Sequence, residues 1–186
     1  MSDLLLKDIS GKAYGSSAER QAYADEHGLK LVQNKGEMQA YKDEENKRIY
    51  VAHRGTSQKK DISADIALLF GQERSHPRFK RAKKMEADLE RQYPGYDFVV
   101  TGHSLGGTLA QSSAGRKRVK SVTTFNKGSG IMDLHRRRSS KQTDYVNVYD
   151  PVSALSLRQK GGKQKRSRKI AKGKHMHSIE SSYRGR

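Results

Sequence analysis

The sequence predicts an α/β fold with a mainly parallel central sheet and helices on both faces. Short apolar runs typical of buried strands alternate with segments whose apolar residues recur every three or four positions. One of these strands leads through a glycine-rich turn directly into a helical segment. The 186 residues suffice for one domain with a substantial core. We therefore expect a single domain over residues 1–186.

The first half of the chain begins with a predicted helix over residues 16–27. Ser16 or Ser17 is suited to cap this helix, and Gly28 to end it. Turn residues then separate three short strands, predicted at 29–33, 37–41 and 48–53. Two further helices are predicted, at 62–70 and 76–93. The last of these has one apolar face, formed by Phe79, Ala82, Met85, Leu89 and Tyr93.

The second half continues the alternation of strands and helices. An apolar strand ends near residue 103 and is followed by a helix that carries Leu105, Leu109 and Ala110. Strands are predicted at 118–125 and 143–149, with a basic loop between them. Parallel strands place their carboxyl ends at one edge of the sheet, so we expect the functional residues to gather there.

The strongest local signal is the segment Gly102-His103-Ser104-Leu105-Gly106-Gly107. A serine with glycines at −2 and +2, between a buried strand and a helix, is typical of a nucleophile elbow. The turn is so tight that side chains at the flanking positions, Gly102 and Gly106, would collide. It lifts the serine oxygen clear of the backbone at the positive end of the helix. Ser104 is therefore the candidate nucleophile.

A serine nucleophile needs a base, which a carboxylate in turn orients. Asp150 directly follows the predicted strand 143–149, at its carboxyl end, and is the candidate carboxylate. Asp144 lies at the opposite end of that strand, and Asp133 lies in a loop rich in glycine and arginine.

Two histidines follow Asp150 in the chain, His175 and His177. We favour His177 as the base and keep His175 as the alternative. The order of nucleophile, acid and base is then Ser104, Asp150 and His177.

A developing oxyanion requires two preorganised hydrogen-bond donors. The backbone N–H of Leu105, directly after the nucleophile, is one candidate. The end of the predicted strand 48–53 offers the other, because Gly55 allows close backbone approach and Thr56 carries both an N–H and a hydroxyl.

Other interpretations of these motifs carry less weight. A strand, a glycine-rich turn and a helix also describe a phosphate-binding loop, but Lys163 lacks the GxxxxGK[ST] spacing that such a loop needs. His103 is expected to pack or to support the site rather than act as the base, and His53 and His76 to be structural or exposed. With no cysteine and no HExxH motif, we expect neither a metal nor a cofactor.

The positive charge is concentrated in the C-terminal part of the chain. Residues 1–115 hold 18 Lys and Arg against 16 Asp and Glu, whereas residues 116–186 hold 20 against 4, which accounts for most of the net charge of +18. The densest run spans residues 158–174 and contains Arg158, Lys160, Lys163, Lys165, Arg166, Arg168, Lys169, Lys172 and Lys174. We expect a mobile loop there that attracts a polyanion, either an anionic membrane surface or nucleic acid.

We see neither a signal peptide nor a transmembrane segment in the sequence. It contains no long apolar run that could cross a membrane, its first residues lack the features of a signal peptide, and there is no cysteine. We therefore expect an intracellular or virion-associated protein.

Taken together, these residues resemble the class 3 (fungal-type) lipase family of α/β-hydrolases. The resemblance rests on His53-Arg54-Gly55-Thr56 with Asp61 and Asp65 after it, on the segment 102–107, on Tyr149-Asp150-Pro151-Val152 and on His177. The spacing of the RGT element and the following aspartates before GHSLGG is particular to that family. This chain is shorter and free of cysteine, like versions encoded by large DNA viruses and some bacteria.

The resemblance implies an α/β-hydrolase-like fold in which Ser104, His177 and Asp150 hydrolyse lipid esters, with Thr56 and Leu105 as oxyanion donors. It further implies that Asp61 braces the oxyanion segment and that residues 66–76 form either a short lid or an ordinary helix face. The expected substrate is a phospholipid, a lysophospholipid or an acylglycerol. The sequence does not indicate an oligomeric state.

Two other functions remain open from the sequence. The protein could be a polyanion-binding protein on a hydrolase scaffold, although few aromatic residues are interleaved with the basic run for stacking on bases. A peptidase or thioesterase would use the same three residues, because the triad defines acyl transfer and not the acyl group.

Overall fold

A computed structural model describes residues 2–56, 76–129, 135–168 and 177–183. Several sequence predictions lie outside these residues, namely the helix at 62–70, Asp61, Asp65, Asp133, Lys169, Lys172, Lys174, His175 and most of the segment 66–76.

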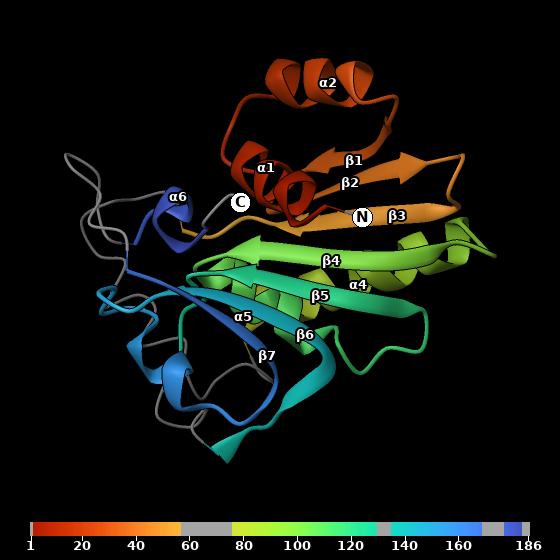
Figure 1. The fold of residues 1–186 in the computed structure, drawn as a ribbon. Coiled ribbons are helices and arrows are strands. Elements are labelled where there is room, and N and C mark those ends of the chain that lie inside the picture. The colour runs from red at the N-terminus through yellow and green to blue at the C-terminus, as the bar shows by residue number, and fades with distance from the viewer. Residues whose placement is uncertain (1, 57–75, 130–134, 169–176, 184–186) are drawn as a thin grey trace.

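The centre of the molecule is a seven-stranded sheet whose strands follow one another in chain order (Figure 1). β1 to β3 are antiparallel to each other, and the remaining neighbours from β3 to β7 are parallel. The strands are β1 (Lys30–Lys35), β2 (Met38–Asp43), β3 (Arg48–His53), β4 (Asp97–His103), β5 (Val119–Phe125), β6 (Arg138–Asn147) and β7 (Gly161–Ser167). The predicted mainly parallel sheet is confirmed.

Helices cover both faces of this sheet (Figure 1). One face carries α1 (Asp3–Lys12), α2 (Ser17–Glu26) and the short α6 (Ile179–Ser182), and the other carries α4 (Pro77–Gln92) and α5 (Leu105–Ser112). A short 3-10 helix, η2 (Ala154–Arg158), lies between β6 and β7.

The strand β3 shows how alternation builds the two-sided core. Ile49 and Val51 pack with α4 and α5, whereas Tyr50 and Ala52 pack with α1 and α2. All four side chains are buried, because successive residues of a strand point to opposite faces.

Local capping explains where two of the helices begin. Ser16 accepts a hydrogen bond from the backbone of Glu19, whose carboxylate accepts one from the backbone of Ser16, so α2 starts with a complete capping box. α1 was not predicted from the sequence. Ser2 caps α1, and Leu6 and Ile9 anchor it on the sheet.

The basic run differs from the sequence prediction. Residues 161–167 form the edge strand β7 instead of a mobile loop, and they pair in parallel with β6. The basic side chains do not prevent this strand from forming because most of them are exposed to solvent. In addition, Lys165 forms an ion pair with Asp3 at 2.7 Å. Lysine on an edge strand also disfavours pairing with other chains.

A buried cluster of charges lies beneath the C-terminal half of the sheet. The carboxylate of Asp144 is 3.4 Å from both Lys127 Nζ and Arg138 Nη1, and all three residues are buried. Thr124 and Gln142 each donate a hydrogen bond of 2.7 Å to its other oxygen. Asp144 is therefore a structural counter-charge within β6.

None of the helices in the described ranges is both long enough and apolar enough to cross a membrane.

The buried Asp144 predicts a large loss of stability on neutralisation. Asp144→Asn removes the buried carboxylate that Lys127 and Arg138 share, so we expect the free energy of unfolding to fall by about 3–5 kcal/mol in urea titrations. The matched control is Asp97→Asn, because Asp97 pairs with Lys120 on the surface at 3.4 Å. The control should change stability by less than about 1 kcal/mol, and equal losses in the two variants would contradict this role.

Candidate active site

The turn between β4 and α5 holds Ser104 in a strained backbone conformation. Its φ of 57° and ψ of −130° are rare for a residue with a side chain. Ser104 is also the N-cap of α5, so the helix begins directly at the nucleophile candidate. This geometry is that of the predicted elbow.

Two glycines make the turn sterically feasible. A Cβ on Gly102 would lie 2.2 Å from the carbonyl oxygen of Gly106, and a Cβ on Gly106 would lie 2.0 Å from that of His53. The backbones of β3, β4 and α5 therefore meet at this turn more closely than side chains allow.

Asp150 and His177 are brought together by the fold. His177 Nδ1 lies 2.8 Å from Asp150 Oδ2, across 27 positions of the chain. Asp150 is buried, and the hydroxyl of Ser153 and the backbone N–H of Val152 donate to its carboxylate at 2.6 and 3.0 Å. These bonds hold the carboxylate in one orientation toward the imidazole.

Two buried side-chain atoms of the candidate site have no hydrogen-bond partner among the described residues. Within the described residues, neither Ser104 Oγ nor His177 Nε2 makes a hydrogen bond, and both atoms are buried. The rings of His177 and His103 lie 4.9 Å apart between centroids, and His103 directly precedes Ser104.

The predicted oxyanion donors flank the same turn. Leu105 is the first residue of α5, so the helix supplies no acceptor for its N–H. A Cβ on Gly55 would lie 3.1 Å from Ser104 Cβ, which places the segment containing Thr56 beside the elbow. Arg78 donates hydrogen bonds to the carbonyl oxygens of Arg54 and Gly55 and so restrains the position of this segment.

A hydrogen-bond chain that the sequence analysis missed links the parts of the site. The N–H of Gly55 donates to the hydroxyl of Tyr14 at 3.0 Å, and that hydroxyl lies 2.9 Å from His103 Nδ1. His103 Nε2 in turn lies 2.6 Å from the carbonyl oxygen of His177. No local pattern marks Tyr14, because its partners are remote in the chain.

The groups at the two ends of this hydrogen-bond chain determine which atoms donate and which accept. A carbonyl only accepts, so Nε2 of His103 carries the proton and its Nδ1 accepts from Tyr14. Burial and the neighbouring His177 lower the pKa of His103 from 6.5 to about 3, which keeps its imidazole neutral. Burial also raises the pKa of the Tyr14 hydroxyl to about 12, so it stays a donor. His103 thus supports the site as a neutral hydrogen-bonding residue.

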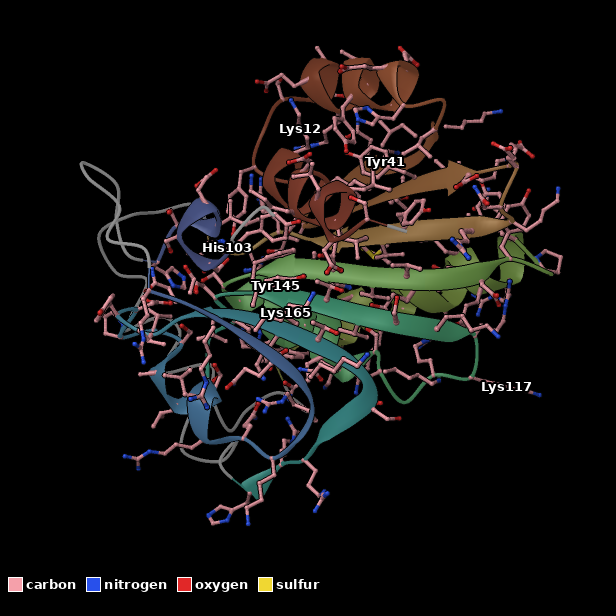
Figure 2. All side chains as sticks on the ribbon, viewed as in Figure 1. Lys12, Tyr41, His103, Lys117, Tyr145 and Lys165 are labelled. Carbon is pink, nitrogen blue, oxygen red and sulfur yellow. The ribbon has the colours of Figure 1, made fainter. Side chains whose placement is uncertain are left out.

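The basic residues named from the sequence lie beside the C-terminal strands. Lys165 contacts Asp3 and the hydroxyl of Tyr145, each at 2.7 Å (Figure 2). Arg166 donates to Gln164 at 2.8 Å. The other described members of the group are exposed, namely Arg158, Lys160, Lys163 and Arg168.

Metal ligands do not gather in the described part of the chain, where no group of three His, Asp or Glu side chains could hold an ion.

The fold is that of the α/β-hydrolase lipases. Yarrowia lipolytica Lip2 lipase matches it with a TM-score of 0.56 and 16% identity over 87% of this chain and 76% of that protein. Rhizomucor miehei lipase in its propeptide complex matches with a TM-score of 0.52 and 18% identity over 81% of this chain. Only 61% of the Rhizomucor enzyme is covered, so this chain spans less than two thirds of its length. The resemblance to class 3 lipases is confirmed at the level of the fold.

The chain belongs to the phospholipase-like proteins with a Tle-like phospholipase domain, whose family model matches residues 14–171. No curated protein matches the sequence significantly.

The low pKa of His103 predicts a measurable dependence of stability on pH. In the unfolded chain His103 takes up a proton near pH 6.5, whereas in the folded protein it resists protonation down to about pH 3. The free energy of unfolding should therefore fall as the pH drops through this interval, by up to about 1.4 kcal/mol per pH unit.

Two measurements check this prediction. NMR titration should show the His103 ring neutral at pH 5, and urea titrations should show a shallower loss of stability toward low pH in His103→Asn than in the wild type. A His103 resonance that titrates near pH 6.5 would contradict the assignment.

Proposed function

We propose that this protein is a serine hydrolase that cleaves carboxylic ester bonds of lipids through Ser104, His177 and Asp150. The observation that carries the proposal is the hydrogen bond from His177 to the buried Asp150, together with the strained turn at Ser104. The family supports lipid esters as the substrate class. Phospholipids and lysophospholipids are favoured over acylglycerols because of the basic C-terminal region.

In the proposed reaction, Ser104 Oγ attacks the ester carbonyl while His177 Nε2 accepts its proton. Asp150 orients the imidazole and stabilises its positive charge. The N–H groups of Leu105 and Thr56 donate to the oxyanion. His177 then protonates the leaving alcohol, and a water that it deprotonates releases the fatty acid from the acyl-enzyme.

The supporting contacts fit this division of roles. The neutral His103 places no second positive charge beside the imidazolium that forms at His177. Its bond to the His177 carbonyl ties the base to the same chain of contacts that holds Gly55. Asp61 is proposed, from the family resemblance alone, to brace the oxyanion segment.

An anionic membrane surface is the proposed partner of the basic edge. β7 is parallel to β4 and β6, so its carboxyl end lies at the same edge of the sheet as Ser104 and Asp150. Arg166 and Arg168 are exposed at this end, and Lys163 is exposed in the first half of the strand. Each basic residue near such a surface contributes about 1 kcal/mol, so this edge would draw anionic phospholipids toward the active site.

Loss of the nucleophile tests the activity directly. Ser104→Ala should abolish fluorophosphonate labelling and lower kcat for p-nitrophenyl esters by about 10⁵-fold or more, and Asp150→Asn by about 10⁴-fold. Ser112→Ala, at the other end of α5, is the matched control and should keep both activities. The acyl chain length that gives the highest kcat/KM distinguishes an esterase from a lipase. If Ser104→Ala kept wild-type turnover, the proposed mechanism would fail.

Vesicle binding tests the basic edge independently of catalysis. In the Ser104→Ala background, Lys163→Gln with Arg166→Gln should weaken binding to phosphatidylserine-containing vesicles by about 30-fold. The matched control, Lys83→Gln with Lys84→Gln, removes the same charge from the exposed face of α4. Equal weakening in both pairs would mean that only the net charge acts. Duplex DNA that binds more tightly than the vesicles would favour the polyanion-binding alternative.

A further inference from the structure

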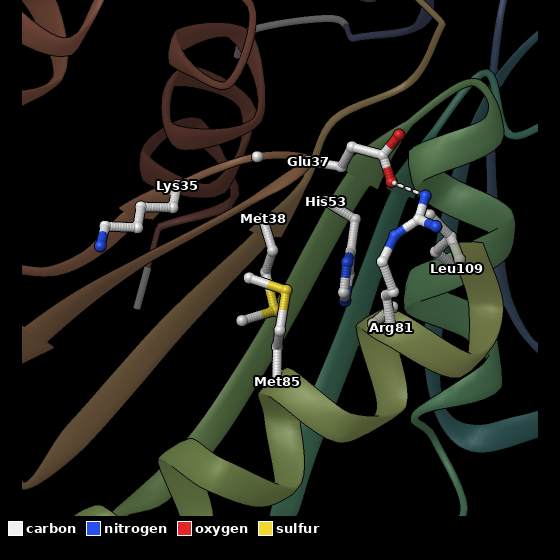
Figure 3. A pocket seen from close by; sticks show the side chains of 9 residues that line it. Lys35, Glu37, Met38, His53, Arg81, Met85 and Leu109 are labelled. Carbon is white, nitrogen blue, oxygen red and sulfur yellow. Dashed lines mark hydrogen bonds and ion pairs between the residues drawn. The ribbon is translucent and has the colours of Figure 1, made fainter. Parts of the chain in front are cut away.

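A pocket of about 410 Å³ lies outside the proposed catalytic site, between the sheet and α4 (Figure 3). Its volume is in the range of ligand pockets. It is lined by Lys35, Gly36, Glu37, Met38, His53, Arg81, Ala82, Met85 and Leu109.

One side of this pocket is apolar. Met38 and Leu109 are almost fully buried and line it together with Ala82 and Met85. Methionine side chains adapt to irregular apolar ligands because they are unbranched and flexible. This side fits a hydrocarbon chain.

The mouth of the pocket carries positive charge. Arg81 lies 3.4 Å from Glu37 (Figure 3). The same carboxylate lies 3.1 Å from Nε of Arg78, which is outside the pocket lining. Lys35 is exposed at the same mouth. The residues that line the pocket therefore include two cations, Lys35 and Arg81, and one carboxylate, that of Glu37, so an anionic group is favoured here.

His53 supplies a buried polar atom on the wall of the pocket. Its side chain is 1% exposed, and its Nε2 lies 2.6 Å from Glu86 Oε1. Its Nδ1 has no hydrogen-bond partner among the described residues. A buried polar atom without a partner is costly, and a bound ligand oxygen would remove that cost.

We propose that this pocket binds the anion of a free fatty acid, with its chain against Met38 and Met85 and its carboxylate at Arg81 and His53. The identity of the ligand rests on the proposed function, because a fatty acid is the product of lipid ester hydrolysis. The pocket adjoins the oxyanion segment, since His53 directly precedes residues 54–56 and its carbonyl abuts Gly106. Product bound here would therefore act on the segment that holds Thr56.

The five methionines of the chain provide the test. In Ser104→Ala labelled with ¹³C at the methionine methyl groups, dodecanoate below its micelle concentration should shift Met38 and Met85 saturably. Met176, next to His177 in the sequence, reports on the proposed catalytic site. Shifts confined to Met176, equal shifts at all five methyl groups, or no shift would overturn the proposal.

Ligand and protein variants separate the head group from the chain. Arg81→Gln should weaken dodecanoate binding by at least about threefold, whereas Lys83→Gln, an exposed neighbour on α4, should not. Butyrate should bind much more weakly than dodecanoate. Dodecanol that binds as tightly as dodecanoate, or an unchanged affinity in Arg81→Gln, would overturn the anionic head group. Because Ser104→Ala binds without turnover, this result is independent of the fluorophosphonate labelling that tests the proposed function.

Discussion

The strained turn at Ser104 is the constraint on which the rest of the structure depends. A residue with φ near 57° in this region costs about 1–3 kcal/mol and persists only when its surroundings determine it. Around Ser104, these surroundings consist of closely packed backbone atoms. Gly102 lies against Gly106, and Gly106 against the carbonyl of His53, at distances that exclude a Cβ. The ends of β3 and β4 and the start of α5 are therefore held in a single arrangement, which also aligns the segment after His53 with the serine.

Two kinds of polar groups stabilise this arrangement from opposite sides. On the α1 side, Tyr14 and His103 form a chain of neutral hydrogen bonds from Gly55 to the carbonyl of His177. On the C-terminal side, Asp144 balances the buried charges of Lys127 and Arg138. Keeping His103 neutral and pairing Asp144 are two solutions to the same problem, because a charge without a partner in the interior is unfavourable.

The distribution of charge separates two surfaces with different proposed roles. The exposed lysine and arginine side chains of β7 form a broad cationic edge suited to a lipid surface. The pocket beside α4 instead combines a few cations with an apolar wall, which suits a single amphiphile. Both proposals place positive charge where a negatively charged substrate or product would arrive, and each rests on different residues.

The sequence by itself determined those parts of the molecule whose signals are local. The start of α2 at Ser16 or Ser17, the strand β3 and the glycine-flanked turn at Ser104 each depend only on neighbouring residues, and all three were predicted. Asp150 and His177 were paired from chain order, and the fold places them 2.8 Å apart.

Only the tertiary structure decided that residues 161–167 are a strand, because a highly basic segment joins a sheet only when β6 offers a hydrogen-bonding edge and Asp3 a counter-charge. The role of Tyr14 was likewise decided only by the tertiary structure. Its contacts to Gly55 and His103 span 41 and 89 positions, so no local sequence pattern indicates them.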